Sequence, residues 1–514
     1  MPEIRVKGSE KAILCENGAN LLQTLLTEGF FVDNPSNGNG TCGKCKVRIL
    51  SGDEPGIRLS CLVEVTEDLE VELLGTEKEG KVLTSGYVPE FEKEFREGYG
   101  IAVDIGTTTA ALDLVRLSDG EVLGQASMLN AQKQFGQDVL TRITYEYDHP
   151  DTGIADLQRA VVESLNEEIR QLCEKAGIEK EEIREIDVAA NCTMMHMLLG
   201  VDARSIGRAP YRPEFTKAQK LKAAGIGLWA GEETMLYCLP SVSAYIGADI
   251  VAGVRVCGLH EETEKVLFID IGTNGEIVLA GGGHLLSCSC AAGPALEGMN
   301  ISCGMRAADG AVEDVRITED GIRLTTIGDG EPEGLCGSGI LAAVKELLRT
   351  GLVKKTGVFV KKDALDPEDY RYDLIRLNGT KRELILDDER DLFIAQGDVR
   401  QVQLAKGAIL SGFTALLKKA GIEMKDLQKV LIAGQFGAHL PAEFLTGVGI
   451  LPEEVEDRLV YVGNSSKTGA YMTLMSETMK QEMEALAEKI EYMELAETEN
   501  YERIFTESMI FPGN

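Results

Sequence analysis

The same short motif occurs twice in this chain, and this repeat constrains the fold more than any other feature. The first copy is Val103–Thr109 (VDIGTTT) and the second is Ile269–Gly275 (IDIGTNG). Each copy lies between two apolar runs, which predicts a strand, a tight glycine turn and a second strand. An aspartate before such a turn can hold a hydrated cation while backbone N–H groups approach a phosphate. Two such turns that face each other would clamp a nucleotide from both sides.

A second pair of matching segments indicates that the motif belongs to a larger duplication. Each member is a helical pattern that ends in Ala-Gly-Ile, at Ala176–Ile178 and again at Ala420–Ile422. A charged connection and a strand ending in small residues follow both, at Val188–Thr193 and Val430–Gly437. The second copy is longer, so we expect an inserted subdomain between Ala280 and Arg400. The pattern predicts two like α/β lobes.

Composition limits the class of protein. A chain of 514 residues with 44% hydrophobic content can bury several cores. It contains no run of 18 apolar residues, and its first residues do not resemble a signal peptide, so we expect a cytoplasmic protein without a membrane partner. The net charge of −32 disfavours nucleic acid and anionic membranes as partners. The twelve cysteines are scattered through apolar stretches, which favours reduced thiols over a disulfide framework.

The first 75 residues have a different character. Ile4–Val6 and Ala12–Leu14 predict a hairpin, and Leu21–Leu26 predicts a short helix. A glycine-rich loop then carries Cys42 and Cys45 in a Cys-x₂-Cys spacing; a strand over Val47–Leu50 follows, and later Cys61. This arrangement resembles plant-type [2Fe–2S] ferredoxins, where glycine lets backbone N–H groups face the cluster. A zinc site is the alternative, but zinc knuckles usually present two close pairs.

Further sequence motifs show a family resemblance over nearly the whole chain. The resemblance weakens after about Ala470. The paired turns together with Ile432–Gly437 resemble the phosphate and adenosine motifs of the acetate and sugar kinase, Hsp70 and actin superfamily. More narrowly, the chain resembles the ATP-dependent reductive activators of corrinoid proteins. The phrases that carry this narrower resemblance are Ala292–Gly298, Ile301–Arg306, Gly334–Gly339 and Gln396–Arg400.

The resemblance implies an α/β fold: a duplicated two-lobe actin/Hsp70-like ATPase preceded by a small α+β ferredoxin-like (β-grasp) domain. The domains expected are 1–75 for the ferredoxin-like domain, 76–98 for a linker, 99–262 for the first lobe, and 263–514 for the second lobe with an inserted subdomain and an acidic tail. We expect the linker to be mobile, with a loop packed on the first lobe as the alternative. We expect the tail to form a solvated acidic helix around 483–493.

The resemblance also implies the residues of an ATP site. Asp104 and Asp270 would each offer a carboxylate to a Mg²⁺-bound nucleotide, stabilising charge and orienting water. Contacts to phosphate and adenosine would come from Gly106, Thr107, Thr108, Gly272, Thr273, Asn274, Gly434, Gln435 and Gly437. Gly337 and Ser338 open a helix, and there an anion site and a tight approach of helix to strand remain equal alternatives.

Iron would be bound by Cys42, Cys45 and Cys61, with one departure from the family pattern. Ser36 stands six residues before Cys42, where the activators have their first cysteine. Three hypotheses remain: Ser36 ligates iron through its oxygen, the cluster is labile or uses another ligand, or the cluster has been lost. Cys15 precedes the short helix, and we expect it to lie too far from the loop to substitute.

Several other residues are of types found in catalytic or metal-binding sites, but their surroundings in the sequence favour a structural role. His196 lies in a stripe of Met and Leu, which is typical of a packed core histidine. Cys288 and Cys290 lie among small residues, and we expect core thiols. Asn191 should face the same cleft as the adenosine motif, whereas Asp249 is a weaker candidate for that cleft.

The function implied is ATP-dependent reduction of inactive cobalt(II) to cobalt(I) in a corrinoid protein of a methyltransferase system, with an electron from the front cluster. The cofactors implied are a [2Fe–2S] cluster, ATP and Mg²⁺. The partners implied are that corrinoid protein and an upstream low-potential electron donor, and a homodimer is compatible with both. Two alternatives remain: an ATP-driven electron injector for another low-potential enzyme, and a non-redox Hsp70-like interaction module.

Overall fold

The structure is a computed structural model, and the chain forms two compact units, Met1–Gly80 and Lys81–Asn514. Each unit is described by itself. The residues that the structure describes are 2–7, 9, 11–28, 30, 32, 45–51, 55–73, 87–379, 381–434 and 440–513.

The first unit is a small α+β fold. Its main sheet has the strand order β2-β1-β7-β4-β5, in which β1 and β7 are parallel and β1 and β2 form the expected hairpin. Helix α1 (Leu21–Thr27) is capped by the side chain of Asn20 and buries Leu21, Leu22 and Leu25. The strands are β1 (Glu3–Val6), β2 (Ala12–Leu14), β3 (Ala19–Asn20), β4 (Lys46–Ser51), β5 (Gly56–Leu59), β6 (Glu64–Val65) and β7 (Leu69–Leu73).

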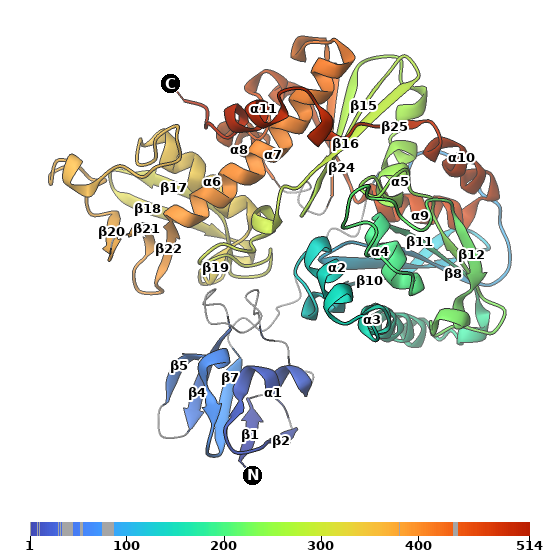
Figure 1. Ribbon diagram of the computed structural model, residues 1–514, viewed down its shortest axis with the longest axis horizontal. Coiled ribbons are helices and arrows are strands. Elements are labelled where there is room, and N and C mark those ends of the chain that lie inside the picture. Colours follow the sequence, from blue (N-terminus) through green and yellow to red (C-terminus); the bar gives the residue numbers. More distant parts are fainter. Residues whose placement is uncertain are drawn as a thin grey trace. The chain divides into compact units, whose positions relative to one another are not determined.

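The first lobe of the second unit is built on a six-stranded sheet with the order β10-β9-β8-β11-β13-β12 (Figure 1). Strand β8 is antiparallel to β9 and parallel to β11. Asp104 lies near the end of β8, before the first glycine turn. The strands are β8 (Tyr99–Ile105), β9 (Thr109–Arg116), β10 (Glu121–Leu129), β11 (Ile183–Ala190), β12 (Gln219–Lys222) and β13 (Met235–Cys238).

The second lobe repeats this topology on a sheet with the order β24-β23-β14-β15-β16-β25. Strand β14, which carries Asp270, is antiparallel to β15 and parallel to β23, as β8 is to β9 and β11. The predicted duplication of two α/β lobes is therefore confirmed. The strands are β14 (Val266–Ile271), β15 (Gly275–Gly281), β16 (His284–Cys290), β23 (Lys429–Ala433), β24 (Leu459–Gly463) and β25 (Ile490–Tyr492).

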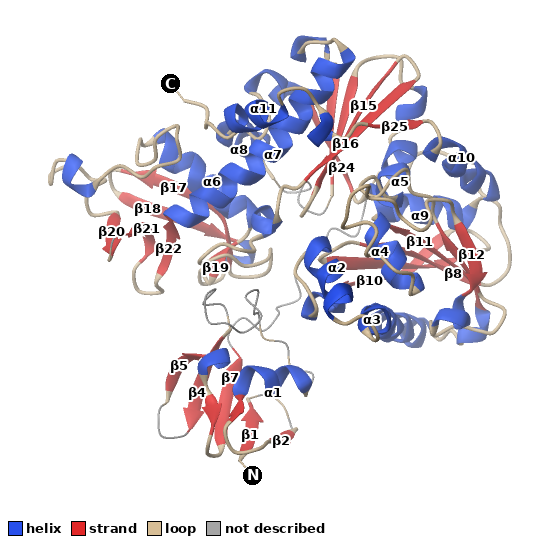
Figure 2. Ribbon diagram, in the orientation of Figure 1, coloured by secondary structure: helices blue, strands red, loops and turns tan. Residues whose placement is uncertain are grey.

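Helices cover both sheets (Figure 2). The long helices α3 and α7 end where the two Ala-Gly-Ile patterns predict, at Gly177 and Gly421, each in the left-handed conformation with φ 68° and 66°. Helix α3 packs on β10, and α7 packs on β15 and β16. The other helices named below are α2 (Val139–Asp148), α4 (Cys192–Leu199), α5 (Ala248–Val256), α8 (Ala442–Val448) and α11 (Tyr501–Ser508), with α3 at Gly153–Ala176 and α7 at Gln396–Ala420.

Between β16 and α7 the chain forms helix α6 and two small three-stranded sheets, of which β18-β17-β19 is mixed and β20-β21-β22 is antiparallel. This inserted region shares one apolar core with the second-lobe sheet, since Val315, Ile340 and Leu384 belong to the same cluster as Ile269. Its elements are β17 (Ala311–Thr318), β18 (Gly321–Thr326), β19 (Gly334–Leu335), α6 (Gly337–Arg349), β20 (Ile375–Asn378), β21 (Lys381–Asp387) and β22 (Leu392–Ala395).

After β24 the chain crosses back to the first lobe, which corrects the expectation of a solvated acidic tail. Helix α9 (Ser465–Met475) packs on β8, β11 and α5, and α10 (Glu477–Ala487) packs on α5 and α9. Met479 and Met483 are buried in the first-lobe core, so the acidic residues of α10 form only its outer face. The chain then returns to the second lobe at β25.

The C-terminal part of the expected linker, which the structure describes, packs on the first lobe. The backbone of Glu94 donates to Met475 O at 2.7 Å, and Arg96 forms an ion pair of 2.5 Å with Glu185. The ring of Phe91 meets Tyr471 edge to face at 6.1 Å. From Phe91 onward the segment is therefore the loop packed on the first lobe that we considered as the alternative to a mobile linker, whereas Tyr87 N donates to Val462 O of β24 at 3.2 Å.

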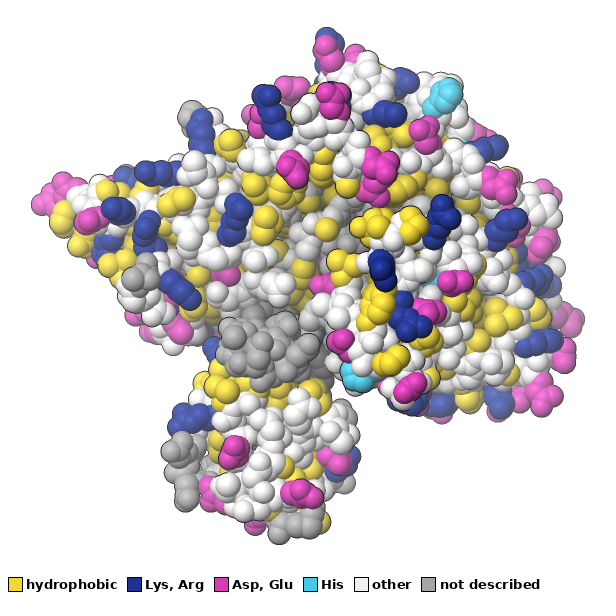
Figure 3. All heavy atoms as spheres, viewed as in Figure 1, with side chains coloured by type: hydrophobic (Ala, Val, Ile, Leu, Met, Phe, Trp, Pro, Cys, Tyr) yellow, Lys and Arg dark blue, Asp and Glu magenta, His cyan; other side chains and the backbone are white. Residues whose placement is uncertain are grey.

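Side chains of both charges are interspersed on the surface of the second unit (Figure 3). None of the helices among the described residues is long and apolar enough to span a bilayer. Among the residues that the structure describes, four cationic side chains are nevertheless almost completely buried: Arg142, Lys406, Lys467 and Lys480.

Candidate functional site

The two glycine turns of the second unit face each other where its two lobes meet, at the position expected for a nucleotide cleft. Thr108 of the first turn and Thr273 of the second have their Oγ1 atoms 3.5 Å apart, although 165 residues separate them in the chain. Each turn is closed locally, by Gly106 N donating to Thr109 O at 2.8 Å and Gly272 N donating to Asn274 O at 2.9 Å. The structure thus brings the two motifs of the repeat together.

The first turn is fastened from inside its own lobe. Asn130 Nδ2 donates to Gly106 O at 2.9 Å, and an Arg142 guanidinium nitrogen donates to Thr107 O at 2.5 Å. Because C=O and the following N–H point in opposite directions across a trans peptide, the N–H groups of Thr107 and Thr108 are directed away from the lobe interior. This orientation suits an anion that approaches from the cleft.

The second turn is fastened in a different way. Thr273 Oγ1 donates to Glu297 Oε1 at 2.8 Å, and Thr273 O accepts from Gly293 N at 2.8 Å. Both partners lie in the Ala292–Gly298 phrase that contributed to the family resemblance. That phrase therefore supports the second turn, a role that the sequence did not reveal.

Asp104 is held by residues far away in the sequence. Its carboxylate accepts from Asn464 Nδ2 at 2.8 Å and from Ser466 Oγ at 2.7 Å, at the junction of β24 and α9. In the same junction Lys467 reaches Asp113 of β9 at 2.5 Å. Sequence reasoning missed these residues; the one available signal was the small polar run Asn464–Ser466 after a strand, which is typical of a helix N-cap.

Four carboxyl groups with raised pKa values lie together here and disfavour one another's ionisation, and Glu297 adds to the effect on Asp270. Burial raises the pKa of Asp270 to about 8, and Asp249, Asp104 and Glu297 contribute to the same shift. Burial and then the neighbouring Asp104 raise the pKa of Asp249 to about 7. The pKa of Asp104 is raised by burial, and that of Glu276 well above its usual value by burial and then by Asp249 and Asp270. A divalent cation would relieve this repulsion.

We expect the raised pKa values to make both stability and nucleotide binding depend on pH. Unfolded carboxyl groups titrate near pH 4, so between about pH 4 and 8 the folded protein binds more protons than the unfolded chain. Its free energy of unfolding without ligand should therefore fall as pH rises through 7 and 8, the values for Asp249 and Asp270. Binding of Mg²⁺-nucleotide should release protons, and affinity should rise by up to about tenfold per pH unit for each proton released.

Thermal unfolding and calorimetry at pH 6, 7 and 8.5, with and without Mg·ADP, would measure both effects. In an Asp270→Asn variant the slope of stability against pH should be smaller, because one titrating group is gone. An affinity that does not change with pH in the wild-type protein would contradict this account of the acidic cleft.

Other predicted residues lie at the cleft or have local roles. A Cβ on Gly434 would lie 2.6 Å from Asp270 Oδ1, so only glycine permits this approach; Gln435 and Gly437 lie outside the described residues. Asn191 Nδ2 donates to Thr107 Oγ1 at 3.1 Å, which confirms its expected place.

His196 accepts from Glu214 N at 3.1 Å and stacks on Phe215, as expected of a packed core residue. Cys288 and Cys290 are also buried, as expected of core thiols.

The start of α6 shows the features of a close helix–strand approach. A Cβ on Gly339 would lie 2.0 Å from Val312 O, so the glycine is needed for packing on β17. Ser338 Oγ lies 3.2 Å from Cys336 Sγ, a local contact. The contacts that the structure gives for Gly337 and Ser338 are thus within the inserted region, and neither residue is brought to Asp104 or Asp270 among them.

In the first unit, two of the predicted iron ligands meet. The Sγ atoms of Cys45 and Cys61 are 3.1 Å apart, and both cysteines are buried and outside any disulfide of the described residues. The neighbouring Ser60 hydroxyl is fully buried and has no hydrogen-bond partner within the described structure. Cys15 contacts Pro2 O instead. Ser36 and Cys42 lie outside the described residues.

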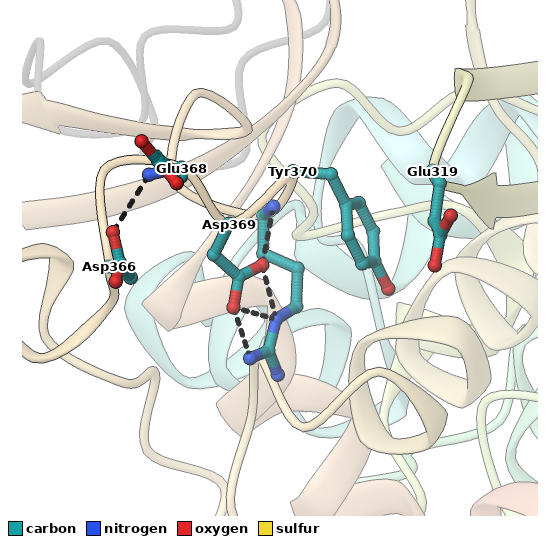
Figure 4. Close-up of a pocket in the computed structure, with 6 residues that line it drawn as sticks. Glu319, Asp366, Glu368, Asp369 and Tyr370 are labelled. Atoms are coloured by element: carbon teal, nitrogen blue, oxygen red, sulfur yellow. Dashed lines mark hydrogen bonds and ion pairs between the residues drawn. The ribbon is translucent and has the colours of Figure 1, made fainter.

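An open pocket of about 490 Å³ lies on the inserted region (Figure 4). Glu319, Asp366 and Glu368 line it, and Asp369 forms a bidentate pair with Arg371, whose guanidinium also donates to Thr350 O at 2.7 Å. The Arg371 pair lowers the pKa of Asp369 to about 2. The pocket contains none of the residues of the two glycine turns.

Two duplicated lobes whose aspartate turns meet across a cleft define a two-lobed ATPase of the acetate and sugar kinase, Hsp70 and actin class. Residues 99–262 match the RACo middle region, and residues 264–514 match the C-terminal domain of RACo, the ASKHA domain. The chain belongs to the RACo family.

Individual relatives agree with this placement. The chain is 35% identical over 434 residues, 83% of this chain and 72% of the relative, to the corrinoid activation enzyme RamQ of Eubacterium limosum. The solved structure of a reductive activator for corrinoid, iron–sulfur protein matches with a TM-score of 0.73 at 29% identity, over 100% of this chain and 99% of that one. The N-terminal region is 36% identical over 86 residues, 14% of this chain and 21% of the relative, to one of the subunits of the Na⁺-translocating NADH-quinone reductase of Marinomonas sp..

Proposed function

We propose that this protein is an ATP-dependent reductive activator of a corrinoid protein, in which the first unit carries the electron and the second unit hydrolyses ATP. The observation that carries the proposal is that Thr108 and Thr273 lie 3.5 Å apart, which brings the two remote motifs together. The corrinoid activation enzyme and the reductive activator named above support the choice of a corrinoid protein as the target. The similarity to an NADH-quinone reductase supports a redox role for the front unit.

The residues of the first unit suit an iron–sulfur cluster. Cys45 and Cys61 are close enough to bind the same iron, and the Ser60 hydroxyl, buried without a partner in the described structure, can donate to a cluster sulfur. We assign Cys42 as the third ligand and Ser36 as the fourth, the position at which the cysteine of the family is replaced. A [2Fe–2S] cluster bound here supplies one-electron transfer from an upstream low-potential donor.

In the second unit we assign the phosphate groups to the two turns. The N–H groups of Thr107 and Thr108 face the cleft side and bind phosphate oxygens. Asp104 and Asp270 act together on the hydrated Mg²⁺ that accompanies the nucleotide, and they orient the attacking water. We assign the adenosine side to Gly434, together with Gln435 and Gly437, which lie outside the described residues.

The β24–α9 junction links nucleotide state to the relative position of the lobes. Strand β24 belongs to the second-lobe sheet, whereas α9 packs on the first, so closure of the cleft must bend the chain between them. Asn464 and Ser466, which hold Asp104, lie at that bend. A change in what Asp104 binds therefore alters the hydrogen bonds of Asn464 and Ser466 at the β24–α9 junction, where the chain passes from one lobe to the other.

ATP is needed because the electron transfer is uphill. A deficit of 100 mV corresponds to about 2.3 kcal/mol for one electron, so a few hundred millivolts exceed what one or two contacts supply. Closure driven by ATP can instead change how the second unit binds the corrinoid protein. That change in binding can alter the environment of the cobalt.

Removal of the first unit separates the two activities. A chain shortened to begin at Lys81 retains the second compact unit, so we expect it to keep ATP hydrolysis within about twofold. It should not pass electrons from a protein donor to a cobalt(II) corrinoid protein. Equal cobalt reduction by the shortened and the full chain would contradict the role of the first unit, and loss of ATPase activity would contradict the independence of the second.

A further inference from the structure

Arg142 resembles Lys406 and differs from Lys467 and Lys480, because it forms no ion pair in the described structure. Lys467 is paired with Asp113 and Lys480 with Glu185, while Lys406 donates to the carbonyl of Ser508 far along the chain. Arg142 lies on α2 directly beneath the first glycine turn and is fully buried. None of these four cations was predicted to be buried from the sequence.

The partners of Arg142 within the described structure are all neutral. The guanidinium donates to the carbonyl oxygens of Gly136 and Thr107, to the side-chain oxygen of Gln132 and to the sulfur of Met194. The nearest charge that influences it is the carboxylate of Asp138, which caps the start of α2 and is partly exposed. A buried cation is costly unless an anion compensates it, so this site favours the arrival of negative charge.

The charge remains in place at neutral pH. Burial lowers the pKa of Arg142 to about 9, and the nearby Asp138 opposes that shift. The guanidinium is therefore protonated at pH 7, and it lies one peptide unit behind the N–H groups that we assign to phosphate. A field from a buried cation is weakly screened and acts over this distance.

The acidic groups of both lobes explain why such a cation is useful. Asp104, Asp249, Asp270 and Glu276 have raised pKa values, and any of them that ionises repels a nucleotide with three phosphates. Mg²⁺ can neutralise part of this charge, but it does not hold the first turn in shape. Arg142 does both, since the same guanidinium that carries the charge also fixes the carbonyl of Thr107.

We propose that Arg142 is a positioning residue for the nucleotide. Its guanidinium holds the first phosphate turn from the side of the lobe interior. Its positive charge, which no buried carboxylate balances in the described structure, is balanced by the phosphate chain when the nucleotide binds. This inference rests on the proposed ATP site at the two turns. It assigns selectivity for the number of phosphates to a residue that does not touch the nucleotide.

The test compares the affinities of the full-length protein for AMP, ADP and ATP with Mg²⁺ by calorimetry. In the Arg142→Gln variant, which keeps an amide donor but loses the charge, ATP affinity should fall about tenfold more than AMP affinity. Arg142→Lys keeps the charge, so its ratio of ATP to AMP affinity should stay within about threefold of the wild type. Arg159→Gln on α3 removes an exposed charge of the same lobe and should leave the ratio unchanged, which controls for net charge.

Three outcomes would overturn the inference. Equal weakening of AMP and ATP binding in Arg142→Gln would mean that the residue only maintains structure, and unchanged ATP binding would mean that its charge is not used. If Arg142→Gln does not fold, Arg142→Lys decides: a loss of the ATP to AMP ratio in that variant contradicts an electrostatic role. Absence of any nucleotide binding by the wild-type protein would instead contradict the proposed function itself.

Discussion

Replacement of Asp270 by Asn is expected to lower ATP hydrolysis about 10²–10³-fold and to leave the fold intact. Because burial raises its pKa to about 8, Asp270 is mostly protonated at pH 7 without nucleotide, and Asn is then close to it in shape and charge. The variant differs from the wild type only when Mg²⁺-ATP requires a carboxylate. The loss should therefore appear in turnover and in Mg²⁺ dependence, while the melting temperature of the free protein stays the same or rises.

Asp104→Asn is expected to cause a similar loss of activity but with some loss of stability. Asp104 accepts hydrogen bonds on both carboxylate oxygens, from Asn464 and Ser466. In the variant an amide NH₂ group replaces one of these oxygens and cannot accept, so one hydrogen bond is lost. Ser466→Ala removes one donor and should cost less activity than either aspartate variant. Asp366→Asn, in the acidic pocket of the inserted region, is the matched control and should hydrolyse ATP normally. Wild-type rates in Asp104→Asn or Asp270→Asn would remove these residues from the site.

The second large effect concerns the first unit. Cys45→Ala and Cys61→Ala should each abolish the iron–sulfur spectrum, because the two thiols are placed to bind one iron, and electron transfer from a protein donor should cease. ATP hydrolysis should continue in both variants, since the second unit is compact by itself. Cys15→Ala is the matched control, because Cys15 is as buried as Cys61 but contacts Pro2 instead.

Iron content, visible absorption and electron paramagnetic resonance of anaerobically prepared protein would measure this loss. The wild type should contain about two irons per chain. Ser36→Cys should raise the reduction potential towards that of an all-cysteine site, because a thiolate donates less strongly to Fe(III) than an alkoxide. Full iron content and an unchanged resonance in Cys45→Ala or Cys61→Ala would show that the ligand set is wrong.

The sequence predicts local features of this fold well because they follow from short-range chemistry. The glycine ends of α3 and α7, the hairpin of β1 and β2 and the strand–turn–strand motifs are set by neighbouring residues. The pairing of Asp104 with Asp270 was inferred from a repeat, which carries long-range information that a single motif lacks. Cys45 and Cys61 were likewise inferred from a spacing pattern rather than from contacts.

The features that the sequence could not predict depend on distant contacts. The acidic character of α10 indicates a solvated helix, yet Met479 and Met483 bury its inner face in the other lobe. The partners of Asp104 lie 360 and 362 residues away, at a junction whose polar residues resemble any helix cap. Arg142 lies in a helix of mixed polarity, where nothing in its neighbours indicates that the charge is buried without an anion.

ATP is expected to drive an electron from this protein onto cobalt. The direct measurement is the rate at which cobalt(I) absorption appears when the anaerobic full-length protein is mixed with its cobalt(II) corrinoid protein and a low-potential donor, with and without Mg·ATP. Our account predicts that cobalt(I) forms rapidly only with ATP, and that ATP hydrolysis rises when the cobalt(II) protein is added. Formation of cobalt(I) at the same rate without ATP would contradict it.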